Sequence, residues 1–231
     1  MKLIKVTLSG WLQSWREDSR WDDRYTTTMP TKSGIIGMIG AAFGYKRGDP
    51  HLNDLNNRLR IAVRADRTGS MEMDYHTATY PGNGQWKCAD GENDHAKTLV
   101  FHKEYLVDAW FTVYLWGDED LLGKVYNALY DPKYPLFLGS KCCIPSVPII
   151  PNWVYASSPK EAVVKNRSDL AINECDRNVQ IQMDVDSGDT VDDERIVFRK
   201  DNIFRADLNE YLLRQVKIFS IIPQKEWGEP A

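Results

Sequence analysis

Alternation of apolar and polar residues predicts strands in several parts of the chain. In residues 2–9 the apolar Ile4, Val6 and Leu8 alternate with the polar Lys5 and Thr7, as a strand with one buried face requires. Residues 61–66 repeat this alternation over a shorter distance. Residues 104–116 alternate over the longest distance, so we expect one long strand there.

A helix is predicted from about residue 31 to Phe43. Pro30 precedes it, and the hydroxyl of Thr31 or Ser33 can accept a hydrogen bond from the first free backbone N–H groups. Gly44 follows at the position where glycine commonly ends a helix, because glycine adopts the left-handed backbone conformation without strain.

A second helix is predicted to begin near Asp118 and to end at residues 131–132. Acidic residues in its first turn suit the positive end of the helix dipole. Its apolar face consists of Leu121, Leu122, Val125 and Leu129. Residues 74–77 are predicted to start another strand. Residues 80–97, which are rich in glycine and polar side chains, indicate a protruding loop or hairpin.

The order strand, helix, strand, hairpin, strand, helix predicts an α+β fold of the ferredoxin-like or RNA-recognition type. Five of the eleven prolines lie in residues 132–151, where we place a transition. We therefore expect an RNA-recognition-like domain over residues 1–148 and a small C-terminal β-rich region over residues 149–231. Strand-like patterns at residues 195–199 and 215–222 support the second part.

Charge is unevenly distributed. The chain carries a formal net charge of -4. Residues 169–194 hold nine acidic side chains and one basic one, so the rest of the chain is positive. The acidic segment is read as a solvated loop, or alternatively as a docking surface for a basic neighbour. Since nucleic acid needs only a local positive surface, an RNA partner is compatible with this composition.

The cysteines indicate neither a disulfide framework nor a metal site. Cys88, Cys142, Cys143 and Cys175 form no CxxC pair, and adjacent cysteines chelate one tetrahedral metal poorly. We expect reduced, mostly buried thiols, no metal and no cofactor. The apolar stretch at residues 34–44 is too short to span a bilayer, and we see no signal peptide, so we expect a cytoplasmic protein without a membrane partner.

Residues 11–25 are the first candidate for RNA binding. Single-stranded RNA is commonly held by aromatic side chains that stack on bases and by cations that bind phosphates. The segment supplies both, in Trp11, Trp15, Trp21, Tyr25, Arg16, Arg20 and Arg24. It also contains four acidic residues, so a packed loop with internal salt bridges is the alternative.

The predicted helix start at residues 31–34 is the second candidate. Free N–H groups at a helix N-terminus attract phosphate, and Lys32 adds charge. Glycines recur along one helix face at Gly34, Gly37 and Gly40, where either close packing or an approaching ligand would explain them. Two further candidates are weaker alone: a histidine at residue 76, and the glycine turn with a lysine at residues 138–141.

Catalytic motifs are not evident. We find no phosphate-binding Walker loop, no HExxH, no GxSxG and no paired zinc spacing. Metal-free RNA cleavage needs a base for the 2′-hydroxyl and an acid for the leaving oxygen. Tyr45, His102 and Lys103 could supply such groups, although nothing in the sequence brings them together.

Taken together, these segments resemble the Cas-five family of CRISPR subunits, and most closely the CasD branch of the type I-E surveillance complex Cascade. The resemblance extends in order from residue 3 to about residue 148. It is carried by residues 13–15, Arg20, Arg24, 30–34 running into Gly44, Arg47 with Asp49, 63–66, 74–77, 104–106, 108–109 and 135–139.

The resemblance implies a domain of the repeat-associated RNA-binding superfamily, with residues 78–103 as a thumb hairpin that contacts the guide and a neighbouring subunit. It implies a non-catalytic subunit that binds and caps the 5′ handle of the CRISPR RNA for antiviral defence. The implied partners are the CRISPR RNA, the backbone subunit CasC and the large subunit CasA, with target DNA reached through the assembled complex.

The resemblance also assigns roles to residues. Those expected to line the handle groove are Gln13, Trp15, Arg20 and Arg24. Those expected to bind phosphate at the helix start are Thr31, Lys32 and Ser33. His76, Lys103 and Lys141 are further handle contacts. Arg16 stands where the family often has Gly, and Ser140 where a basic residue commonly precedes Lys, so the loop and the turn depart from the pattern at these positions.

Two other functions stay open at this point. In type I-C systems a relative of this subunit cleaves precursor CRISPR RNA without metal, using Tyr, Lys and His; here the comparable set is Tyr45, His102 and Lys103. A scaffold that contacts only protein is the other alternative, and it predicts that the purified complex retains no RNA.

Overall fold

The computed structural model describes residues 1–17, 23–82, 86–87, 93–94, 98–185, 195–208 and 210–227. Its main element is a seven-stranded sheet in the order β10-β1-β9-β4-β11-β13-β12, in which every neighbouring pair is antiparallel. These strands are β1 (Lys2–Ser9), β4 (Leu59–Arg67), β9 (Trp110–Gly117), β10 (Asn152–Tyr155), β11 (Val179–Asp184), β12 (Arg195–Arg205) and β13 (Glu210–Ile221).

Five helices accompany the sheet in the described part of the chain. They are α1 (Lys32–Phe43), α2 (His51–Arg58), α3 (Glu119–Tyr130), α4 (Pro159–Lys165) and α5 (Pro223–Trp227). The order β1-α1-β4-β9-α3-β10 with spatial order β10-β1-β9-β4 is the ferredoxin-like arrangement, so the predicted fold class is confirmed. None of the helices in these ranges is long and apolar enough to cross a membrane.

The ferredoxin-like unit extends past the predicted boundary, because its fourth strand is β10. Strands β11, β13 and β12 then continue the same sheet from the outer side of β4. The change of topology within the sheet therefore comes after β10, which ends at Tyr155. The division of the chain into a domain over residues 1–148 and a region over residues 149–231 stays a prediction.

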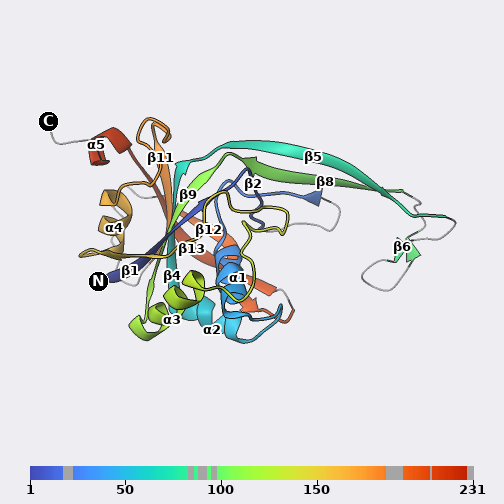
Figure 1. The fold of residues 1–231 in the computed structure, drawn as a ribbon, viewed down its shortest axis with the longest axis horizontal. Coiled ribbons are helices and arrows are strands. Elements are labelled where there is room, and N and C mark those ends of the chain that lie inside the picture. Colours follow the sequence, from blue (N-terminus) through green and yellow to red (C-terminus); the bar gives the residue numbers. More distant parts are fainter. Residues whose placement is uncertain are drawn as a thin grey trace.

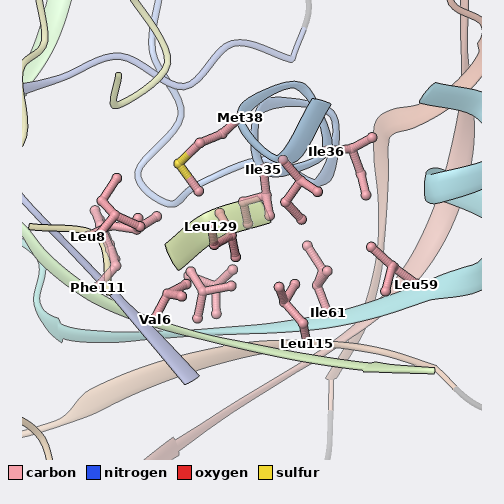
Figure 2. Close-up of a cluster of buried hydrophobic side chains, with 14 of the residues drawn as sticks. Val6, Leu8, Ile35, Ile36, Met38, Leu59, Ile61, Phe111, Leu115 and Leu129 are labelled. Carbon is pink, nitrogen blue, oxygen red and sulfur yellow. The ribbon is translucent and has the colours of Figure 1, made fainter. Parts of the chain in front are cut away.

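The larger hydrophobic core lies between this sheet and the pair α1 and α3. Figure 2 shows Val6, Ile61 and Leu115 from the strands facing Ile35 of α1 and Leu129 of α3. A 12-residue helix needs such a partner, because helices of this length are marginal alone in water. Burial of these apolar side chains thus fixes α1 against the sheet and sets the direction of its remaining faces.

The opposite face of the sheet buries a polar network together with α4 and α5. Arg64 is fully buried, and its Nε donates to Asp66 Oδ1 at 2.6 Å. Its Nη1 donates to the Val163 and Asn166 carbonyls, and its guanidinium lies 4.3 Å from the centre of the Trp227 ring. One buried cation therefore attaches both C-terminal helices to β4.

A long hairpin leaves the body of the protein. It consists of β5 (Ser70–Thr79) and β8 (Thr98–Val107), paired in continuous register, and Figure 1 shows it reaching away from the rest of the chain. Short strands accompany it: β2 (Leu12–Gln13) and β3 (Asp23–Arg24) pair with β8, and β6 (Trp86–Lys87) pairs with β7 (Asn93–Asp94). The predicted protruding hairpin is confirmed and begins earlier in the chain than expected.

The prediction of one continuous strand over residues 104–116 is wrong. β8 ends at Val107 and β9 begins at Trp110, and the two belong to different sheets. Between them Asp108 adopts a left-handed φ of 58°, and Arg67 holds it through hydrogen bonds to both its carbonyl and its carboxylate. The apolar alternation runs unbroken through this bend, so it gave no sign of the break.

Candidate nucleic-acid interface

The start of α1 is occupied by the protein's own groups. Thr31 caps the helix, its hydroxyl accepting a hydrogen bond from the Gly34 N–H at 3.3 Å. The Lys32 N–H donates to Asp201 Oδ2 at 2.7 Å, and Lys32 Nζ lies 3.4 Å from Asp184. Burial lowers the pKa of Lys32, against the opposing effect of Asp184. A carboxylate therefore stands where the sequence predicted a phosphate.

Lys32 belongs to a buried cluster of two cations and two anions, which we call the ionic cluster: Lys32, Asp184, Asp201 and Arg214. Arg214 donates to both carboxylates, with its Nε 2.6 Å from Asp201 Oδ1. Burial alone would lower the pKa of Arg214, but these two carboxylates raise it. Direct phosphate binding by Thr31 and Lys32 would require the bonds of these two residues to break.

The glycine face of α1 has two functions. A Cβ at Gly34 would stand 2.9 Å from the Trp15 ring, and one at Gly40 would collide with Leu52, so both glycines permit close packing. A Cβ at Gly37 would meet nothing within 4 Å, because this part of the face opens into a cavity of about 510 Å³. Packing alone therefore does not account for the whole glycine pattern.

This cavity, which we call the glycine cavity, combines small, cationic and aromatic groups. Ser33 and Gly37 form its helix side, and Arg47 and Lys141 contribute positive charge. Phe137 and Tyr211 also line it. Small residues that let a backbone approach, cations for phosphate and aromatic surface for bases are the features expected of a site for single-stranded RNA. Ser33 and Lys141 were predicted from the sequence; Arg47 was not.

Residues 137–143 connect this cavity to the loop before β3. Gly139 has a φ of 86°, and a Cβ there would collide with the Ser14 carbonyl oxygen. The Ser14 N–H donates to the Leu138 carbonyl at 3.1 Å. Only glycine fits this close approach, which holds Lys141 beside the N-terminal loop.

Gln13 and Trp15, which were predicted to line the handle groove, lie inside the protein. Both are fully buried. Trp15 Nε1 donates to Gln13 Oε1 at 3.0 Å, and Gln13 Nε2 donates to the Ala109 carbonyl at 2.8 Å. Their hydrogen-bonding groups are thus used to fix the loop, and contact with RNA would require it to open.

Arg16 belongs to the cations of the RNA-binding candidate at residues 11–25, although the resemblance assigned it no handle contact. Burial and the neighbouring Arg24 lower its pKa. Among the described residues its buried Nε has no hydrogen-bond partner, and its Nη2 lies 3.5 Å from Ser140 Oγ. Two cations held close together favour a bound anion. A basic residue directly after a buried tryptophan was the available signal.

Other predicted contacts lie along the hairpin. Arg24 of β3 is in register with Lys103 of β8, so the cations of this surface continue from Arg16. His76 stacks on Phe101 with ring centres 5.2 Å apart, and its Nδ1 lies 3.3 Å from Asp74. Arg20 falls outside the described residues.

The alternative catalytic set is not assembled. Tyr45 stacks between Phe43 and His51 at the end of α1. His102 packs against Tyr75 on the hairpin. His102 and Lys103 are consecutive in β8, so their side chains point to opposite faces of the ribbon. Tyr45, His102 and Lys103 therefore do not converge on one phosphodiester.

The thiols are only partly as expected. Cys143 is buried, Cys175 is half-buried and Cys142 is exposed, while Cys88 lies outside the described residues. Burial raises the pKa of Cys143 to about 12 and that of Cys175 to about 11, so both thiols stay protonated. Within the described ranges, three or more potential metal ligands do not come together anywhere.

Comparison with known proteins agrees with this fold. The family model described as CRISPR-associated protein (Cas_Cas5) matches residues 3–217. The chain is 31% identical over 173 residues to the CRISPR system Cascade subunit CasD of Escherichia coli strain K12, covering 69% of this chain and 74% of that protein.

Solved structures give the same result. A chain of a CRISPR RNA-guided surveillance complex superposes with a TM-score of 0.71 at 26% identity, covering 95% of this chain and 89% of that one. A Cas protein crystal structure gives a TM-score of 0.69 at 25% identity, covering 96% of both chains. With the family model spanning most of the sequence, the chain belongs to the CRISPR-associated Cas5 protein family.

Proposed function

We propose that this chain is a non-catalytic subunit of a cytoplasmic Cascade complex and that it holds the 5′ handle of the CRISPR RNA. The RNA would run from the glycine cavity, past Lys141, to Arg16, Arg24 and Lys103; we call these cations, together with Arg47, the cationic track. The observation that carries this proposal is the open glycine cavity, whose lining includes Arg47 and Lys141.

Each part of the track suits RNA that is held rather than cut. The open face at Gly37 lets a sugar-phosphate chain approach the helix backbone, and the cations neutralise its phosphates. Tyr211 and Phe137 offer aromatic surface to unstacked bases. Since Tyr45 and His102 belong to separate clusters, we expect repeat RNA to remain intact with the purified chain, and equally so with His102→Ala.

The hairpin is our proposed contact with neighbouring subunits, the backbone subunit CasC first and the large subunit CasA second. Its β5 strand exposes Met71, Met73 and Tyr75 on one face. Exposed apolar side chains in a row on a two-stranded ribbon favour burial by a partner. Target DNA would be reached only through the assembled complex.

The experiment is to measure handle binding with the double variant Arg47→Glu, Lys141→Glu, co-expressed with the other subunits and the guide. We expect at least a tenfold loss of affinity for a labelled handle RNA. The negative slope of log affinity against log salt concentration should become less steep by about 1.4, because two contacts to single-stranded RNA are lost.

Lys225→Glu is the matched control, because Lys225 is an exposed lysine on α5 and outside the track. If the double variant binds the handle as tightly as this control does, the proposed track is wrong. If the complex assembles without any RNA in the wild type, the scaffold alternative replaces it.

A further inference from the structure

A column of parallel rings lies on the outer side of α3. Tyr126 stacks on Trp153 of β10 with ring centres 4.6 Å apart and planes within 5°. Tyr130, one turn further along α3, lies parallel to Tyr126 within 7°. Lys2 Nζ closes the other end, 3.7 Å from the centre of the Trp153 ring. The column therefore has a cation at one end and the exposed ring of Tyr130 at the other.

The open end of this column borders a cavity of about 550 Å³ between the C-terminal ends of α1 and α3. Tyr130 and Phe43 both line it, and Phe43 is itself the end of a second stack, with Tyr45 and His51. The ring planes of Phe43 and Tyr45 lie within 12° of each other. Two aromatic stacks thus end at one cavity.

Polar groups complete the lining. Lys124 and Lys133 contribute positive charge, while Asn127 and Asp131 offer hydrogen-bonding oxygens. We propose that this cavity is a second nucleic-acid site, which takes one unstacked base of a single strand. The base lies on Tyr130 and extends the column, the lysines hold the flanking phosphates, and Asn127 and Asp131 accept hydrogen bonds from the base edge.

A nucleotide fits this chemistry better than a bare anion does. Both helices end at residues that line this cavity, so the negative ends of their dipoles, like Asp131, disfavour a lone phosphate. The amino and ring N–H groups of a base are hydrogen-bond donors, so these acceptors suit the base edge. The exposed aromatic ring suits the face of the base, and the lysines suit the phosphates.

Packing accounts for part of the column but not for its exposed end. Tyr126 and Trp153 are half-buried and join α3 to the edge strand β10. Tyr130 is 69% exposed and adds little to that contact. The lining shares no residue with the glycine cavity, so this site is separate from the proposed handle site.

The test uses the full-length chain and a short oligouridine that lacks the handle sequence and carries 5-iodouracil, prepared both as RNA and as DNA. Photo-crosslinking followed by mass spectrometry locates the contact, and fluorescence anisotropy gives the affinity. The protein carries Arg47→Glu and Lys141→Glu, so that the glycine cavity does not contribute. We expect a crosslink within residues 42–43 or 119–134 and about a tenfold loss of affinity for Tyr130→Ala, a typical value for one stacked base.

Two variants make the result specific. Tyr130→Phe keeps the ring and should keep the affinity, and Tyr155→Ala removes an equally exposed tyrosine outside the column. The RNA and DNA arms show which strand the site prefers. The proposal is overturned by equal affinities for Tyr130→Ala and Tyr155→Ala, by crosslinks only outside residues 42–43 and 119–134, or by a protein subunit crosslinking to Tyr130 in the assembled complex.

Discussion

Two regions built from one short stretch of sequence, residues 31–37, are used in opposite ways. Thr31 and Lys32 are buried: Asp201 and Asp184 accept hydrogen bonds from the N–H and the Nζ of Lys32, and the Thr31 hydroxyl accepts one from the Gly34 N–H. Ser33 and Gly37 face outward into the glycine cavity, beside Lys141. Adjacent residues of one helix turn thus separate into a structural part and a part available to a ligand.

The difference teaches that residue type alone does not identify a phosphate site. A lysine at a helix start satisfies a phosphate or a buried carboxylate equally well by its chemistry. The choice is made by Asp184 and Asp201, which lie more than 150 positions further along the chain. The contacts available to RNA are the groups that these distant residues leave exposed.

The largest expected effect is on the inward part. Asp201→Ala removes an acceptor from the Lys32 N–H and from Arg214, and leaves Arg214 underneutralised in a buried site. We expect a loss of about 3–5 kcal/mol in the free energy of unfolding, the usual cost of breaking a buried ion pair. Denaturant unfolding measures it.

Asp207→Ala is the matched control, because Asp207 pairs with Arg205 on the surface, where an ion pair contributes little. Equal stability of the two variants would show that the ionic cluster does not hold the start of α1. The contacts that fix the start of α1 would then lie elsewhere in the strands β11 to β13.

The next effect separates stability from binding at one position. Gly37→Ala replaces a helical glycine where a Cβ meets no neighbour within 4 Å, so the unfolding free energy should rise by up to about 1 kcal/mol. The added methyl stands in the glycine cavity, and handle affinity should fall in the same variant.

Gly40→Ala tests the other use of the same helix face: its Cβ would overlap Leu52 Cδ2, so Leu52 must shift and the stability gain should be smaller than in Gly37→Ala. Handle affinity that is unchanged or higher in Gly37→Ala would mean that the RNA does not approach this face. Measuring both quantities on both variants therefore distinguishes the packing glycine from the cavity glycine.

Local signals in the sequence identified much of the fold. The strand at residues 2–9, the helix at residues 31–43 with both caps, and the helix that begins after Asp118 are all present. Each has a period, a cap or a glycine stop within its own residues. The helix α2 was missed because its sequence is mostly polar and shows no apolar stripe, and residues 104–116 were wrongly joined because the bend at Asp108 leaves the apolar alternation intact.

The site was less accessible to prediction than the fold. Lys141 and Ser33 were identified and do line one cavity. Gln13, Trp15 and Lys32 were predicted to meet RNA and are instead buried, because their partners Ala109 and Asp184 are remote in the sequence. Arg47 and Arg16 are brought beside other site residues, such as Lys141 and Ser140, only by the folding of the chain. Their contact with RNA, like that of the other site residues, stays a prediction.

The smallest expected effect compares two carboxylates that serve helix starts. Asp201 reaches α1 from a distant strand, whereas Asp118 caps α3 from the preceding residue and is exposed to solvent. Hydrogen bonds from the Leu121 N–H and from Arg58 hold the pKa of Asp118 below its ordinary value of 3.8. A depressed pKa stabilises the fold above the unfolded-state pKa, and this contribution is lost as the pH falls through the folded-state pKa.

Asp118→Asn keeps an acceptor for the helix cap and removes only the charge. We expect a slightly lower melting temperature than wild type at neutral pH, and no difference once the pH is well below 3.8. A difference that persists in acid would mean that the shape of the cap, and not its charge, stabilises α3. In that case the comparison with Asp201 would rest on burial alone, because the charge of the exposed carboxylate would add nothing to the cap.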